Sequence, residues 1–131
     1  MNGAGTVQAF AVALDAEDYE TALALLEPAA AYHRDGQLIS GAPAIVESFR
    51  KSAEWGRSKV DALEFSHEID EALPSEIVFI DIFRCENDAL EIRHAMELTI
   101  SQRGLISELR FVSTPGEREM LNEFLRRHGV R

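Results

Sequence analysis

The sequence predicts an α+β fold, because helical and strand patterns occupy separate parts of the chain. Three segments with apolar residues at helical spacing lie in the first half, and one hairpin signal interrupts them. Four segments that alternate apolar and polar residues follow, and a short helical pattern ends the sequence. Such segregation is typical of helices packed on an antiparallel sheet. We expect the 131 residues to form one domain, spanning residues 1–131.

The first two helices are predicted by one apolar face and one capping residue. Val7, Phe10 and Leu14 recur at helical spacing before the pattern breaks. Asp18 is a typical N-cap residue, because its short carboxylate can accept a hydrogen bond from a backbone N–H of the first turn. It predicts a second, short helix that ends at Glu27-Pro28.

A hairpin and a third helix follow. The dipeptide Asp35-Gly36 favours a tight turn, so residues 30–40 are expected to form two paired strands. The third helix is expected to begin at Gly41-Ala42-Pro43, because the first turn of a helix tolerates proline. Gly56 is expected to end it.

The second half predicts a meander of four strands and a closing helix. The strands are expected over residues 63–69, 76–85, 89–101 and 105–112. The turns between them are expected at Pro74-Ser75, Asn87-Asp88 and Arg103-Gly104. Thr114-Pro115-Gly116-Glu117 has the spacing of a capping box with proline at the first helical position, and Gly129 is a typical C-terminal cap.

Two polar residues interrupt the apolar pattern of the central hairpin, namely Asp81 and His94. If Asn87-Asp88 is a two-residue loop, the strand register places Asp81 directly opposite His94. Burial lowers the pKa of a histidine and a neighbouring carboxylate raises it, so the two together can titrate near neutral pH. We therefore predict Asp81 and His94 as a catalytic acid–base pair.

Further pocket residues are expected around this pair. A turn centred near Leu73 would place His67 beside Phe79 on the same face of the sheet. The predicted substrate-binding residues are Tyr32, His67, Phe10, Trp55, Phe79, Phe83 and Met96.

Each of these assignments has a plainer alternative. The Asp–His pair and His67 could be satisfied structural groups, and Tyr32 could be an amphipathic wall residue. Trp55 fits a pocket rim and a dimer contact equally well. Two histidines with one aspartate could also form a facial metal triad, but no ligand spacing supports it, so neither a metal ion nor another cofactor is expected.

Composition and charge exclude several classes of partner. The net charge of −10 argues against nucleic acids and anionic membrane surfaces, since both attract basic faces. The lone Cys85 excludes an intrachain disulfide and a cysteine-based zinc site. No apolar run has the length of a membrane span, and no signal-peptide pattern is present, so a cytoplasmic location is expected. Ile80 and Ile82 on the outer sheet face predict a homodimer.

The order of elements resembles the NTF2-like superfamily, which includes ketosteroid isomerases, SnoaL-type polyketide cyclases and scytalone dehydratase. The resemblance rests on "LDAEDYETALALLEP" before a hairpin, then "ISGAPAIVESF", then "RGLISELRFV". It implies a cone in which a curved, mostly antiparallel sheet wraps around three N-terminal helices, with a short C-terminal helix. It also implies a mostly apolar pocket for a small hydrophobic molecule.

The same resemblance argues against the steroid isomerase reaction. The family's general base falls on Tyr32, its first oxyanion donor on Phe10, and its second donor on Met96 or His94. Phe10 has no donor, and the phenol of Tyr32 is a poor base at neutral pH. Two functions remain open: an enzyme that dehydrates, isomerises or cyclises its substrate through Asp81 and His94, and a non-catalytic ligand-binding or accessory protein.

Overall fold

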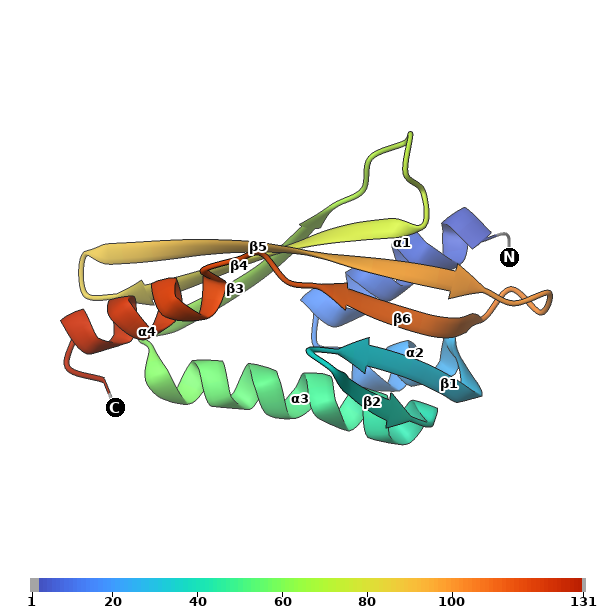
Figure 1. Ribbon diagram of the computed structural model, residues 1–131, viewed down its shortest axis with the longest axis horizontal. Coiled ribbons are helices and arrows are strands. Elements are labelled where there is room, and N and C mark those ends of the chain that lie inside the picture. Colours follow the sequence, from blue (N-terminus) through green and yellow to red (C-terminus); the bar gives the residue numbers. More distant parts are fainter. Residues whose placement is uncertain (1–2, 131) are drawn as a thin grey trace.

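The computed structural model describes residues 3–130, in which four helices lie against one six-stranded sheet (Figure 1). The elements are α1 (Gly3–Asp15), α2 (Tyr19–Ala24), β1 (Leu26–Arg34), β2 (Gln37–Ser40), α3 (Ala42–Lys59), β3 (Ala62–Glu68), β4 (Glu76–Cys85), β5 (Asp88–Ile100), β6 (Ile106–Val112) and α4 (Glu117–Arg127). The α+β class and the order of elements are therefore confirmed. No helix within this described range is long and apolar enough to cross a membrane.

The sheet has the strand order β2-β1-β6-β5-β4-β3. The strands β3, β4, β5 and β6 form an antiparallel meander, and β1 joins its edge by pairing parallel to β6. The hairpin β1–β2 turns at Asp35-Gly36, as predicted, with Arg34 opposite Gln37. The sheet is therefore mixed, because the N-terminal hairpin pairs with the last strand of the meander.

The helices bury their apolar sides against one face of this sheet. Residues of α1 and α3 share a buried cluster with β4, β5 and β6, and residues of α4 share a second cluster with β3, β4 and β5. In Figure 1, α3 runs along the sheet from the short hairpin toward α4. These two buried clusters are separate. A cavity lies between them, since its wall includes residues of both clusters.

Two helix ends differ from the prediction. α2 ends at Ala24, and Glu27 and Pro28 belong to β1, where the pairing with β6 is interrupted between Leu26 and Ala31. Proline has no N–H for the ladder, which accounts for such an irregularity. α3 continues past Gly56 to Lys59. Gly56 is therefore not a helix end; it allows close packing, since a Cβ atom there would lie 2.6 Å from Leu63 Cδ2.

The closing helix begins two residues later than predicted. Gly116, at φ +84°, is its N-cap, so Pro115 lies outside the helix. Only one half of the capping box forms, since Glu117 Oε2 accepts a hydrogen bond from Thr114 N at 3.4 Å. The predicted C-terminal cap is confirmed, because Gly129 lies at φ +72° and its N–H donates to Arg126 O at 3.0 Å.

The central turn is also displaced by one residue. Its loop is Glu86-Asn87, with Glu86 at φ +55°, and Asp88 already pairs with Cys85 at the end of β5. The Asp88 carboxylate is held by α4, where His128 Nε2 lies 3.0 Å away and Arg127 Nη2 lies 2.5 Å away. These contacts are compatible with Asp88 as the first residue of β5, paired with Cys85.

Candidate functional site

A cavity of about 1270 Å³ lies between α3, the inner face of β3–β5 and the N-terminal end of α4. Aromatic and aliphatic side chains make up about half of its wall, and ionisable and other polar side chains make up the rest. Seven of the nine predicted site residues line it: His94, Asp81, Tyr32, Trp55, Phe79, Phe83 and Met96. The predicted polar residues therefore meet open space instead of a sealed core.

The displaced turn overturns the predicted Asp81–His94 register. Asp81 lies opposite Ile92 on β5 and Phe65 on β3, whereas His94 lies opposite Phe79. A one-residue shift of the turn moves the pairing by two residues, which keeps both side chains on the inner face but places them diagonally. Asp81 and His94 share the cavity without forming the predicted direct pair.

Asp81 is a carboxyl group without a polar partner. Its side chain makes no hydrogen bond or ion pair with any residue in the described part of the chain. Burial, and then the negative charges of Glu117 and Asp15, raise its pKa to about 7. At neutral pH this carboxyl therefore exists in both protonation states, as a general acid or base requires.

His94 is a neutral imidazole among aromatic rings. Its ring centroid lies 6.0 Å from that of Phe79 and 5.1 Å from that of Phe111. Its Nδ1 atom is buried, and the nearest carboxylate oxygen, Glu117 Oε1, is 3.6 Å away, too far for a hydrogen bond. Burial, and then the charge of Arg34, lower its pKa to about 4. The imidazole can exchange hydrogen bonds with a ligand but carries no charge at neutral pH.

His67 and Phe10 lie outside the cavity wall. His67 is opposite Phe79, as predicted, but its Nδ1 contacts Asp15 Oδ2 at 2.5 Å under α1. Phe10 is fully buried and packs edge-on against Phe49, with centroids 6.1 Å apart. Within residues 3–130, no group of three or more His, Cys, Asp or Glu side chains could hold a metal ion.

Asp15 is the main site residue that the sequence pattern did not identify. It lies at the last position of α1 and lines the cavity, and its Oδ1 atom is buried without a hydrogen-bond partner. A signal was present, because Asp15 stands four residues after the buried Ala11 and eight after the buried Val7. Glu117, near His94, is likewise not predicted as a site residue, because its place in the expected capping box accounts for it without a site.

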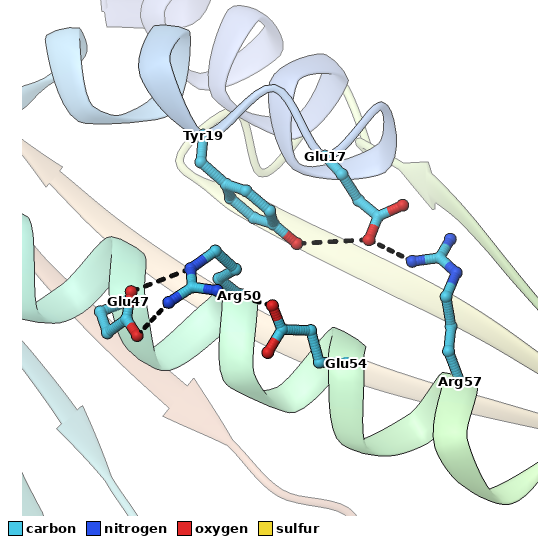
Figure 2. A network of polar contacts seen from close by, with 6 residues as sticks. All are labelled: Glu17, Tyr19, Glu47, Arg50, Glu54 and Arg57. Atoms are coloured by element: carbon cyan, nitrogen blue, oxygen red, sulfur yellow. Dashed lines mark hydrogen bonds and ion pairs between the residues drawn. The ribbon is translucent and has the colours of Figure 1, made fainter.

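Two tyrosines supply neutral phenols to the wall. Burial raises the pKa of Tyr32 and of Tyr19 to about 12. Tyr32 packs on Phe49, with ring centroids 5.2 Å apart. Figure 2 shows that the Tyr19 hydroxyl points to Glu17, which also contacts the guanidinium of Arg57 on α3. This network ties the loop after α1 to the helix that forms one wall of the cavity.

The outer part of the wall is charged with both signs. Trp55, a residue that is 47% exposed, lies at this rim with the ammonium of Lys59 5.9 Å from the centre of its ring. Figure 2 also shows Arg50 of α3 between Glu47 and Glu54, so neighbouring charges on this helix pair with one another. The charged residues lining the cavity are Asp15, Arg34, Asp35, Lys51, Asp81, Glu117, Arg118 and Glu119.

Sequence comparison gives no relative: no family model matches the chain, and no curated protein is significantly similar to it. Solved structures do match. A Mycobacterium tuberculosis protein in complex with estradiol-17β-hemisuccinate is 19% identical with a TM-score of 0.61, over 89% of this chain and 98% of that one. An M. tuberculosis LEH-like epoxide hydrolase is 18% identical with a TM-score of 0.64, over 96% of this chain and 90% of that one.

A Δ5-3-ketosteroid isomerase from Mycobacterium sp. is 17% identical with a TM-score of 0.58, over 89% of this chain and 97% of that chain. These proteins and the SnoaL-like polyketide cyclases among the matches are all NTF2-like. The chain therefore has the NTF2-like fold that its resemblance implied. At these identities the similarity establishes the fold, and the reaction has to be argued from the site.

Proposed function

We propose that the cavity binds a small, mostly apolar molecule and that Asp81 exchanges a proton with it. The observation that carries this proposal is the position of the Asp81 carboxyl, which lines the cavity without a polar partner. Burial there raises its pKa to about 7. A buried ionisable group that faces a pocket and titrates near neutral pH is a typical acid–base catalyst. Dehydration, isomerisation and cyclisation are reactions that such a group can catalyse without a cofactor.

In this proposal His94 contacts the ligand directly and does not act through Asp81. Its neutral ring lies on the neighbouring strand, where it can donate or accept a hydrogen bond with the same ligand. The ligand class is supported by the aromatic wall, and by the structural neighbour that was solved with an estradiol derivative. The steroid isomerase reaction itself is not proposed, because Phe10 and Tyr32 replace the groups it needs.

A test can use 2-tetralone, a neutral bicyclic ketone, as a probe. Exchange of its α-hydrogens for deuterium in D2O, followed by proton NMR, reports proton transfer directly. The protein should accelerate exchange above the buffer rate, and Asp81→Asn should lose about 100-fold of that acceleration. Glu71→Gln removes a negative charge from an exposed turn outside the cavity and is the matched control.

Two results would separate the alternatives. Saturable 2-tetralone binding without any accelerated exchange would favour the non-catalytic ligand-binding function. Full exchange activity in Asp81→Asn would remove Asp81 from the mechanism. Native mass spectrometry of the purified protein, which detects retained small molecules, would then identify the natural ligand class.

The proposal also includes a homodimer that covers the outer face of the sheet, and a cytoplasmic location. The centre of this face carries Val78, Ile80 and Ile82. Ile80 is 7% exposed and lies between Ser66 and Arg93 on the neighbouring strands, where Arg93 pairs with Glu68 at 2.5 Å. A second copy would remove the remaining apolar surface from water.

A further inference from the structure

The end of β1 places an arginine on the inner face of the sheet. Side chains alternate between the two faces along a strand, so Arg34 shares a face with the buried Tyr32. His33, between them, lies on the outer face and contacts Glu108 at 3.0 Å. Arg34 lines the cavity, and its guanidinium carbon lies 5.7 Å from the centre of the Phe111 ring. A charged side chain thus occupies a position at which an apolar one would complete the wall.

The hydrogen-bond donors of Arg34 are incompletely used. Its Nη1 atom donates to Ser52 Oγ over a long distance of 3.4 Å, and its Nε atom lies 3.8 Å from Asp35 Oδ2, beyond hydrogen-bond distance. Its Nη2 atom has no acceptor within residues 3–130. A guanidinium that binds a carboxylate usually does so through two parallel N–H groups at about 2.7–2.9 Å. Arg34 therefore retains donors for a group that enters the cavity.

Two further cations of the cavity wall have no carboxylate partner. Lys51 and Arg118 line the cavity, and neither forms an ion pair within the described part of the chain. Lys51 is the residue before Ser52, which Arg34 contacts. Arginines outside the cavity wall are paired with carboxylates, namely Arg50, Arg57, Arg84, Arg93, Arg103, Arg110, Arg126 and Arg127. In a chain with 23 acidic and 13 basic residues, cations left without a close partner at one cavity indicate a site for an anionic group.

The charges also polarise the cavity. After burial, the largest effect on the pKa of both Tyr32 and His94 is the positive charge of Arg34. At Asp81 the effects that follow burial are the negative charges of two other carboxylates. The electrostatic potential is therefore positive beside Arg34 and negative beside Asp81. A ligand with one anionic end and one neutral end would be bound in one orientation.

We propose that the ligand of this cavity carries a carboxylate, and that Arg34 binds this carboxylate while the apolar part of the ligand extends along the aromatic wall toward Asp81. This inference rests on the ligand binding in the proposed function, and it adds the chemical class of the ligand and its orientation. Arg34 is thus a specificity-determining residue, because a neutral ligand would leave its guanidinium unused. Lys51 and Arg118 add positive charge at the same cavity.

The test compares two naphthalene probes of similar size: 2-naphthoate, which is ionised at pH 7.5, and 2-naphthamide, which is neutral. Calorimetry should show that the unmodified protein binds 2-naphthoate about 10-fold more tightly, as expected for a charge-assisted hydrogen bond. The low end of the usual range applies, because the Arg34 side chain is 35% exposed. Arg34→Gln should lose this preference, whereas Arg34→Lys should keep part of it, since lysine retains the charge but not the paired donors.

The matched control is Arg103→Gln, which also removes one positive charge. The Arg103 side chain is 69% exposed, pairs with Glu27 and does not line the cavity. The preference for 2-naphthoate should therefore be unchanged in this variant. An equal loss of preference in Arg103→Gln and Arg34→Gln would mean that net charge alone is responsible, and the inference would be wrong.

NMR can locate the bound probe without any variant. Arg34 and His94 both contact the ring of Phe111, and the centroids of the His94 and Phe111 rings are 5.1 Å apart. Bound 2-naphthoate should therefore shift the signals of the His94 ring hydrogens and leave those of His33, on the outer face, unchanged. Binding that leaves the His94 signals in place would put the probe outside the cavity and overturn the inference, even if the Arg34 variants do not fold.

The outcomes also separate this inference from the proposed function. Equal affinities for the two probes, or an undiminished preference in Arg34→Gln, would overturn the inference, while exchange of 2-tetralone would leave the proposed function intact. A preference for 2-naphthoate that depends on Arg34, without exchange of 2-tetralone, would support the inference and remove the proton transfer. Absence of binding by both naphthalene probes would overturn the inference.

Discussion

His94 faces Phe79 across the β4–β5 ladder, with 6.0 Å between their ring centroids. This pairing removes the histidine from the direct reach of Asp81 and surrounds it with apolar rings. The imidazole is consequently neutral, and its chemistry differs from that of the carboxylate-paired histidine, titrating near neutral pH, that the sequence pattern predicts.

The first prediction concerns the titration of His94. Its pKa in the folded protein is about 4, below the ordinary value of 6.5, so protons bind preferentially to the unfolded chain. The stabilisation from the neutral ring is complete above pH 6.5 and is lost as pH falls toward 4. NMR of the ring hydrogens should show no titration above pH 5, and His94→Gln should reduce the acid sensitivity in that window. A midpoint near 6.5 would contradict the prediction.

The second prediction concerns Asp81 and stability. Its pKa rises from 3.8 to about 7 on folding, so the neutral carboxyl favours the folded state below pH 4 and that contribution is lost as pH rises to 7. Asp81→Asn cannot ionise, so its stability relative to the unmodified protein should increase from pH 4 to 7 and then level off. Urea unfolding at pH 4.5, 6 and 8 measures this difference, and a constant difference would exclude the raised pKa.

The third prediction concerns the contact between α3 and β3. Gly56→Ala would improve helix propensity by about 1 kcal/mol in an exposed helix. Here the added methyl group would meet Leu63 Cδ2 at 2.6 Å, so we expect a net destabilisation of about 1–3 kcal/mol. In a Leu63→Ala background the same substitution should be harmless or stabilising. Additive effects of the two substitutions in urea unfolding would argue against this contact.

The fourth prediction concerns assembly. If the outer face around Ile80 and Ile82 pairs with a second copy, light scattering at micromolar concentration should give twice the mass of one chain. Ile82→Lys would place a charge in that interface and should return the mass to that of a monomer. The mass of a single chain for the unmodified protein would contradict the homodimer.

Local chemistry made several elements predictable from sequence. The Asp35-Gly36 turn, the Asp18 cap and the Gly129 cap form as expected, since each depends on a few adjacent residues. The strand over residues 76–85 forms at the predicted bounds, because its apolar run lies between clear turn signals. The resemblance to NTF2-like proteins likewise gave the fold, which depends on the order of such elements.

The arrangement of residues in the site, in contrast, depends on the tertiary structure. The sequence contained the turn residues of the central hairpin, but the loop is Glu86-Asn87, and Asp88 contacts Arg127 and His128, about forty positions away. Asp15 and His67 are separated by 52 positions and meet only when α1 packs on β3. Periodicity determines which face of a strand or helix a side chain occupies. Which polar groups on those faces become neighbours depends on the packing of distant elements, because hydrogen bonds and charges act over a few ångströms in space and not along the chain.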